Sequence, residues 1–269
     1  MQAEGQAEHS RRLAAAIFDV DGVLVASPHE RAWQEAFAEL MEGEWRDIAP
    51  ATSYRPGCFD SAVYQTHVSG KPRMSGARAV LDYFGVPDAA TRAVEYAERK
   101  QRRILELIAA GEFVAFDDAL RFLVELRIRH VRTAAASSSK NADDFMRQIH
   151  VGRFLSDAEG PQAPQRNDET LLDLFDANVC GRDLKHGKPH PDIFLLAAEE
   201  LGAPPAQCVV IEDAPAGVEA AKAGGMMALG VARFDDEDLL QAAGADLVVK
   251  ALDQVEVEAL LAGQLQRAR

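Results

Sequence analysis

The chain has 269 residues, 48% hydrophobic and 27% charged, the composition of a globular protein with one large domain or two smaller ones. Its formal net charge of −14 argues against nucleic acid and anionic membranes as partners, because a strongly acidic surface repels both. The three cysteines form no CxxC pair and neither a membrane span nor a signal peptide is visible, so we expect a reducing, cytoplasmic setting.

Taken in chain order, a polar stretch is followed by alternating apolar and amphipathic segments. The stretch, residues 1–12, is expected to form a disordered tail. Short apolar runs predict strands at residues 13–18, 131–136, 177–180, 208–211, 227–231 and 246–249. Apolar residues at helical spacing predict helices at residues 29–41, 77–84, 89–110, 116–130, 142–149, 193–201 and 216–223.

Two regions depart from this alternation. Residues 29–113 are helical or loop-like and punctuated by proline and glycine, without a strand pattern. We therefore expect a helical cap there, inserted into a core formed by residues 13–28 and 114–269. Residues 156–170 (SDAEGPQAPQRNDET) are polar and contain proline and glutamine, which predicts a mobile surface loop.

Strands that alternate with helices predict an α/β fold, with a parallel sheet covered by helices on both faces. Such sheets bind ligands at the carboxyl ends of their strands, so polar residues that follow strands are candidates for a site. Four such clusters are Asp19 with Asp21, residues 137–141 (SSSKN), Lys188, and Glu212 with Asp213. The topology is expected to bring them together at one edge of the sheet.

Each cluster has a plain structural alternative when it is considered alone. The DVDG segment around Asp19 is equally typical of an Asp-Gly turn. The serines from Ser137 and the acidic pair at Glu212 are typical of helix caps. Lys188 is compatible with a solvated loop. Four clusters of useful type at four strand ends nevertheless favour a shared site.

The chemistry that these residue types suit is phosphoryl transfer. Mg²⁺ prefers hard oxygen ligands, which the four carboxylates offer. One carboxylate can attack phosphorus to form an aspartyl-phosphate, while a second moves the proton. Ser137 and Lys188 can then hold the phosphoryl oxygens and offset their charge.

Four segments, IFDVDGVL, AAASSSKN, GKPHPDIF and VVIEDAPAGVEAAKAGG, resemble in order and spacing the motifs of the haloacid dehalogenase (HAD) superfamily. The resemblance covers residues 17–249 and implies a Rossmann-like core. It implies that Asp19 is the nucleophile and Asp21 the general acid/base, with Ser137 and Lys188 binding phosphate. Its implied Mg²⁺ ligands are Asp19, Asp21 and Asp213, with Glu212 beside them. Dehalogenases of this superfamily lack the second aspartate and need no metal, so the resemblance argues against a dehalogenase.

A helical cap between the first two motifs resembles the group that contains β-phosphoglucomutases and many small phosphatases. The segments HERAW, VSGKPRMSG and AERKQRR resemble mutase segments near the first motif, in the cap loop and in a cap helix. The resemblance implies that the following residues bind the substrate: His29, Gly70, Lys71, Arg73 and Lys100. The SSSKN match adds Ser139, Lys140 and Asn141.

Several features depart from the mutase pattern. The segment before His29 is shorter than in mutases, and Ala26 stands where an acidic residue is usual. Ser69 and Gly76 replace a lysine and a serine that are common in the cap loop. His29 is also compatible with a simple helix cap, and Lys100, in a basic run, with a solvated helix face.

Three other enzyme classes are disfavoured by the motifs. Ser137 and Lys140 match an SxxK pattern, but neither SDN nor KTG follows it. The GxxxxGK[ST] loop of nucleotide-binding proteins is missing from the sequence. The seven histidines lack the ligand spacing of a zinc enzyme.

We therefore predict a cytoplasmic, Mg²⁺-dependent phosphotransferase that is a monomer or a weak homo-oligomer. The favoured reaction interconverts β-glucose 1-phosphate and glucose 6-phosphate through a bisphosphate. The alternative is a phosphatase of a sugar phosphate or another small phosphorylated metabolite, in which water takes the phosphoryl group. A catalytically silent binding protein is disfavoured, because it has no physical need for a nucleophile, a metal site and a phosphate clamp together.

Overall fold

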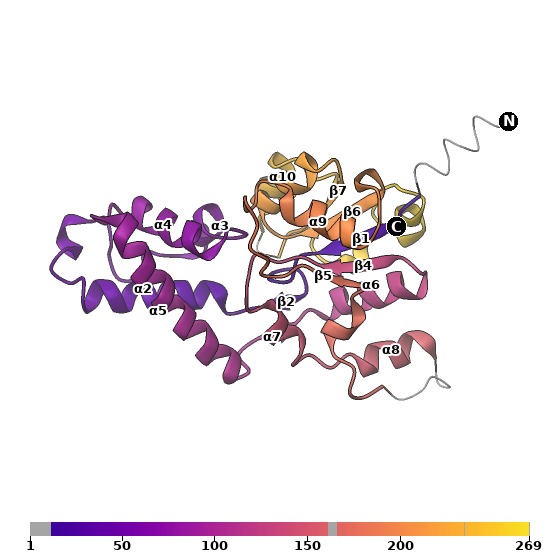
Figure 1. Ribbon diagram of the computed structural model, residues 1–269, viewed down its shortest axis with the longest axis horizontal. Coiled ribbons are helices and arrows are strands. Elements are labelled where there is room, and N and C mark those ends of the chain that lie inside the picture. Colours follow the sequence, from indigo (N-terminus) through magenta and orange to yellow (C-terminus); the bar gives the residue numbers. More distant parts are fainter. Residues whose placement is uncertain (1–11, 161–165, 234, 269) are drawn as a thin grey trace. The chain divides into compact units, whose positions relative to one another are not determined.

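The computed structural model describes residues 12–160, 166–233 and 235–268, which divide into two compact units (Figure 1). The core unit ends at Ala26 and resumes at Ala115, and the inserted unit is Ser27–Val114. The range predicted for the cap, residues 29–113, lies inside the inserted unit. Of the predicted tail, residues 1–11 lie outside the described residues, as do residues 161–165 of the predicted loop.

The core unit contains a six-stranded parallel sheet in the order β5-β4-β1-β6-β7-β8. The strands are β1 (Ala15–Phe18), β4 (Arg132–Ala135), β5 (Ala177–Asn178), β6 (Cys208–Glu212), β7 (Met227–Val231) and β8 (Leu247–Val249). β1 lies in the middle, with Ile17 opposite Ala134 on one side and Val210 on the other. The predicted α/β fold with a parallel sheet is thereby confirmed.

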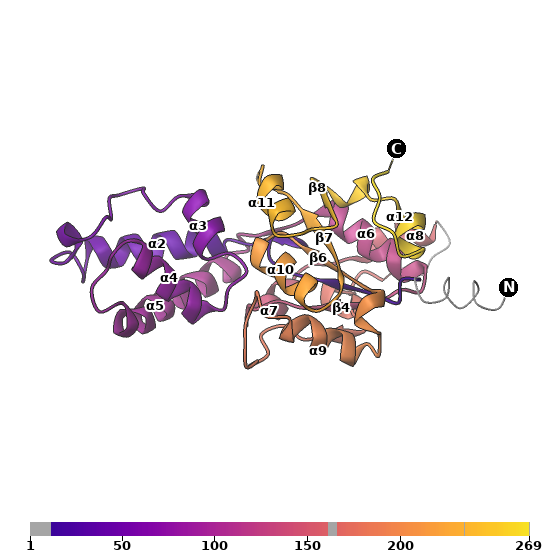
Figure 2. The same cartoon turned by 90° about the horizontal axis from the view of Figure 1, so that it is seen from above.

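Helices cover both faces of this sheet, as Figure 1 shows. On one face Ile17 belongs to a buried cluster with Phe194 of α9 (Asp192–Glu200) and Val218 of α10 (Pro215–Ala223). Seen from above in Figure 2, α10 lies over β6 and β7. On the other face Phe18 packs against Phe122 of α6 (Asp117–Ile128), with ring centroids 6.3 Å apart. Burial on both faces is why β1 is an uninterrupted apolar run.

Three core helices were not predicted. They are α8 (Gly152–Glu159), α11 (Glu237–Ala242) and α12 (Val257–Leu261). The prediction of a loop from residue 156 is wrong at its start, because residues 156–159 complete α8. That helix buries Phe154 and Leu155 in its first half and ends in polar residues, so its apolar face is too short to show a period. The other short core elements are α7 (Ala142–Met146) and the 3₁₀ helices Leu171–Leu174, Pro205–Gln207 and Leu252–Gln254.

The inserted unit is helical, as predicted. Its helices are α2 (His29–Glu42), the 3₁₀ helix Ala49–Ala51, α3 (Ser61–His67), α4 (Arg73–Tyr83) and α5 (Ala89–Ala109). Its core is aromatic: Phe37 packs against Phe84 and Tyr96, and the Tyr96 hydroxyl donates to the carbonyl of Trp33 over 2.8 Å. No helix within the described ranges is both long and apolar enough to cross a membrane.

Arg233 joins the two core segments that flank the insertion. They pair as the short strands β2 (Val25–Ala26) and β3 (Val114–Ala115). The guanidinium of Arg233 lies 4.0 Å from the ring centroid of Phe116, just after β3. It also donates to the carbonyl of Val23 over 3.3 Å and forms an ion pair with Asp118 at 3.0 Å. Arg233 thus fixes the loop that carries the first aspartates.

Candidate active site

The acidic and serine clusters occupy the carboxyl edge of three adjacent strands, β4, β1 and β6. Asp19 directly follows β1, and its amide donates to the carbonyl of Ile211 over 3.0 Å, continuing the ladder to β6. On the other side, the amide of Ala136 donates to the carbonyl of Phe18 over 2.8 Å. This pairing fixes Asp19 between Glu212, the last residue of β6, and Ser137, two residues beyond β4.

Lys188 reaches this edge from the long loop between β5 and α9. Its Nζ donates to Oδ1 of Asp19 at 2.6 Å and to Oε1 of Glu212 at 2.5 Å, and its side chain is 0% exposed. It also lies 4.9 Å from the ring centroid of Phe194. Burial lowers the pKa of Lys188, but the two carboxylates outweigh burial and hold that pKa above its usual range. The alternative of a solvated loop lysine is therefore wrong.

Glu212 combines a local and a long-range role. Its Oε2 accepts from the amide of Ala214 over 3.0 Å, which is the kind of contact expected of an acidic residue before a helix. Its other oxygen binds Lys188. The space for this carboxylate comes from Gly217, where an added Cβ would lie 1.8 Å from Oε1 of Glu212. Sequence reasoning missed Gly217, although the residue lies within the fourth motif.

The carboxylates of this cluster carry more negative charge than Lys188 offsets. Burial raises the pKa of Asp19, Lys188 lowers it, and the charges of Glu212 and Asp21 raise it again, with a result of about 7. Burial, Glu212 and Asp19 likewise raise the pKa of Asp213 well above its usual range. Groups in this state gain from a divalent cation, which favours their charged forms. The hard oxygens of Asp19, Asp21 and Asp213 fit Mg²⁺.

Gly22 brings the first and fourth motifs into contact. Its φ of +84° lies in the region that favours glycine, and an added Cβ would lie 1.9 Å from Oδ2 of Asp213. The DVDG segment therefore forms the predicted turn, and its Gly22 also packs directly against the carboxylate of Asp213. The Asp-Gly pair was visible in the sequence, but its contact with Asp213 was not.

We expect Gly22→Ala to reduce Mg²⁺ affinity and to destabilise the core by about 1–3 kcal/mol, because the new Cβ must displace the Asp213 carboxylate. Titration calorimetry with Mg²⁺ and urea unfolding would measure the two effects. The matched control is Gly225→Ala, since Gly225 also has a positive φ of +71° but nothing lies within 4 Å of its Cβ position. Equal Mg²⁺ affinity in the two variants would contradict the proposed contact.

The serine segment forms two successive turns ahead of α7. The Ser137 Oγ accepts from the amide of Ser139 over 3.0 Å, and the Ser139 Oγ accepts from the amide of Asn141 over 3.2 Å. Ser137 and Asn141 are buried. Lys140 instead reaches outward, where its Nζ binds Oδ1 of the exposed Asp183 at 2.7 Å. The structure does not bring Lys140 together with the carboxylate cluster.

In the inserted unit, His29 and Lys100 lie together. Both are buried, and the Nζ of Lys100 lies 3.3 Å from Nδ1 of His29 and 5.2 Å from the ring centroid of Trp33. The neighbouring Arg99 and Arg103 instead pair with glutamates on the surface of the unit. The alternative of a solvated helix face is therefore wrong for Lys100.

The cap loop contributes the remaining candidates. Gly70 adopts a φ of +73°, and the Nζ of Lys71 donates to the carbonyl of His67 over 2.8 Å. Burial lowers the pKa of Lys71. Arg73 is exposed at the start of α4, and its guanidinium donates to the side chain of Gln101, the residue after Lys100. This contact joins the loop to the helix that carries Lys100.

The chain resembles known proteins over most of its length. The family model for haloacid dehalogenase-like hydrolases matches residues 13–225. The β-phosphoglucomutase of Bacillus subtilis (strain 168) is 31% identical over 256 residues, which cover 92% of this chain and 94% of that protein. The fructose-1-phosphate phosphatase of Escherichia coli (strain K12) is 29% identical over 225 residues, or 82% of this chain and 97% of that protein.

A solved structure gives the same result at the level of the fold. The archaeal β-phosphoglucomutase from the hyperthermophile Pyrococcus sp. strain ST 04 superposes with a TM-score of 0.65 at 31% identity. The match covers 92% of this chain and 96% of that chain. Together with the parallel sheet, the helical insertion and the strand-end cluster around Lys188, these matches identify an enzyme. The chain belongs to the haloacid dehalogenase-like hydrolases, within the β-phosphoglucomutase-like group of that superfamily.

Proposed function

We propose that this protein is a Mg²⁺-dependent sugar-phosphate mutase that works through an aspartyl-phosphate on Asp19. The observation that carries the proposal is the buried Lys188, which binds Asp19 and Glu212 at once within a cluster of carboxylates. Such a cation holds the nucleophile in place and offsets the charge of an arriving phosphoryl group. The predicted cytoplasmic location, and the predicted monomer or weak homo-oligomer, remain parts of this proposal.

In the proposed mechanism Lys188 binds Oδ1 of Asp19, so attack on phosphorus falls to Oδ2. The bond from phosphorus to the leaving sugar oxygen breaks, and Asp21 gives that oxygen a proton. The donor in this step is the sugar bisphosphate, which becomes a sugar monophosphate. The free hydroxyl at the other position of a sugar monophosphate then returns a proton to Asp21 and attacks the aspartyl-phosphate, so that the bond from phosphorus to Asp19 breaks and the sugar bisphosphate forms again. Mg²⁺ held by Asp19, Asp21 and Asp213 would supply positive charge for the phosphoryl oxygens. Ser137 would donate to one of these oxygens.

The inserted unit is proposed to act as the substrate-reading cap. Lys100 of α5 is buried beside His29, and Arg73 begins the neighbouring helix α4. Because the chain has a net charge of −14, a local group of cations of this kind is needed to attract an anionic substrate, which supports the proposed role. Gly70 and Lys71 would shape the same loop. In the core unit, Ser139 and Asn141 would contact the substrate, whereas Lys140 is held outward by Asp183.

A mutase is favoured over a phosphatase because β-phosphoglucomutases are among the relatives at 31% identity that match nearly the full length. The phosphatase alternative has support of its own, since curated relatives at 29% and 27% identity are a fructose-1-phosphate phosphatase and a phosphorylated carbohydrates phosphatase. Both reactions share formation of the aspartyl-phosphate. They differ in whether a sugar hydroxyl or water takes the phosphoryl group.

The test is to supply β-glucose 1-phosphate with Mg²⁺ and a trace of the sugar bisphosphate. Formation of glucose 6-phosphate without free phosphate supports the mutase. Phosphate released in equal amount to the substrate consumed overturns it in favour of the phosphatase. A panel of phosphorylated sugars and small acids then bounds the substrate class.

We expect Lys100→Gln to lower kcat/KM for the sugar phosphate about 10- to 100-fold, the effect of losing one charge-assisted hydrogen bond. Phosphorylation of Asp19 by acetyl phosphate should change little, because that donor has no sugar for the cap to bind. Arg102→Gln is the matched control, since Arg102 is exposed on the same helix. Equal losses with both donors would show that Lys100 does not act through sugar binding.

A further inference from the structure

Two histidines and an aspartate converge on the loop that carries Lys188. Nδ1 of His190 lies 2.7 Å from Oδ1 of Asp192, and Nδ1 of His186 lies 3.2 Å from Oδ2 of the same carboxylate. The two imidazole rings are 4.2 Å apart between centroids. Candidate ligand atoms of all three residues lie within 4.8 Å of one another. The spacing in KHGKPHPD was not recognised as a ligand pattern in the sequence.

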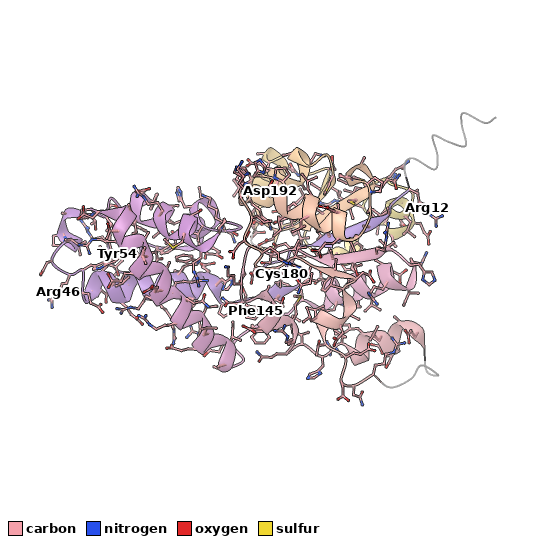
Figure 3. All side chains as sticks on the ribbon, viewed as in Figure 1. Arg12, Arg46, Tyr54, Phe145, Cys180 and Asp192 are labelled. Carbon is pink, nitrogen blue, oxygen red and sulfur yellow. The ribbon has the colours of Figure 1, made fainter. Side chains whose placement is uncertain are left out.

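The backbone holds the three side chains in this arrangement. The amide of His190 donates to the carbonyl of Gly187 over 3.0 Å, which closes a turn between the two histidines. Inside the turn, Lys188 is tied to the buried carboxylates. Asp192 is the first residue of helix α9 and is labelled in Figure 3. Because the turn is fixed at both ends, ordering the three ligands requires little further loss of conformational freedom.

The site is also open to solvent. The side chains of His186 and His190 are 44% and 49% exposed, and that of Asp192 is 26% exposed. Two imidazole nitrogens and one carboxylate oxygen form a ligand set that suits Zn²⁺ and similar transition metals, with water completing the shell.

We propose that His186, His190 and Asp192 form a binding site for a divalent transition metal such as Zn²⁺, separate from the carboxylate cluster proposed for Mg²⁺. Binding replaces each contact between Nδ1 and the Asp192 carboxylate by ligation of the ion through Nδ1 and that carboxylate, and each bound imidazole is then the neutral tautomer with its proton on Nε2. The ion would tie the turn that presents Lys188 to the start of α9. The proposal does not depend on which phosphoryl acceptor the enzyme uses.

Titration calorimetry with Zn²⁺, on the full chain in saturating Mg²⁺, tests this site. We expect the double variant His186→Asn/His190→Asn to bind one equivalent of Zn²⁺ fewer than the unmodified protein. The control is His130→Asn: His130 is an exposed histidine of the same unit, and its φ of +61° is one that asparagine tolerates. The control should bind Zn²⁺ like the unmodified protein.

Thermal unfolding supplies a second readout. Zn²⁺ should raise the Tm of the unmodified protein and of the control by more than it raises the Tm of the double variant. The same Zn²⁺ stoichiometry in the double variant and in the unmodified protein would overturn the proposal, as would the absence of Zn²⁺ binding to the unmodified protein. An effect of Asp19→Asn on this equivalent of Zn²⁺ would place the ion in the carboxylate cluster instead.

Discussion

Asp19→Asn is expected to abolish phosphoryl transfer, with a loss of at least about 10⁴-fold in kcat, while leaving the fold intact. The amide nitrogen that replaces one carboxylate oxygen cannot attack phosphorus in its place. The fold should survive because the remaining oxygen can still accept from Lys188, and Lys188 keeps its bond to Glu212. The burial of Asp19 already disfavours its charged form, so a neutral side chain is tolerated there.

Four measurements check this result. Product formation from the sugar phosphate should vanish, and acetyl phosphate should no longer label the protein. The Tm and the circular dichroism spectrum should stay close to those of the unmodified protein. Retained activity in a folded Asp19→Asn protein would sink the aspartyl-phosphate mechanism, together with the mutase and the phosphatase that rest on it.

Lys188→Met should both inactivate and destabilise the protein, by about 3–5 kcal/mol. Methionine fills a similar volume but leaves Asp19 and Glu212 buried without their shared cation. An unpaired buried carboxylate is costly, and two of them face each other here. Urea unfolding in the presence of EDTA measures the loss.

Added Mg²⁺ should restore more stability to Lys188→Met than to the unmodified protein, because the variant has the larger excess of negative charge for the ion to offset. The control is Lys222→Met, in which the lysine lost is bound to Asp246 at 2.7 Å but both side chains are about two-fifths exposed (37% and 38%). Removing such an exposed pair should cost less than about 1 kcal/mol. An equal loss in the free energy of unfolding in the two variants would show that the buried ion pairs of Lys188 stabilise the protein no more than an exposed pair does.

Local patterns in the sequence were sufficient for most of the core elements. β7 has the predicted bounds, β6 ends one residue later than predicted, and α9 begins and ends one residue earlier than predicted. The two strands have strong patterns because both faces of the sheet are buried, so their apolar runs are continuous. Helix α9 was visible because its apolar residues have helical spacing. The helices α8, α11 and α12 were missed because each is short, and stability in such helices comes from packing onto the core rather than from their own periodicity.

The candidate cluster was also largely predictable. Asp19, Ser137 and Glu212 could be placed at one edge because parallel strands align their carboxyl ends. Lys188 lies ten residues beyond the end of β5, so strand alignment alone does not place it, and only its position in a motif marked it as a candidate. Its double ion pair depends on how the long loop folds back, which local patterns do not encode.

The sequence by itself determined the α/β class, the helical insertion and the residue types of a phosphoryl-transfer site, because these follow from periodicity and from the order of motifs along the chain. Tertiary structure decided which charges meet. It separated the buried Lys100 from the partly exposed arginines beside it, turned Lys140 outward to Asp183, and joined His186 and His190 to Asp192. Such pairings depend on burial and on contacts between distant segments, and neither is a property of any single stretch of sequence.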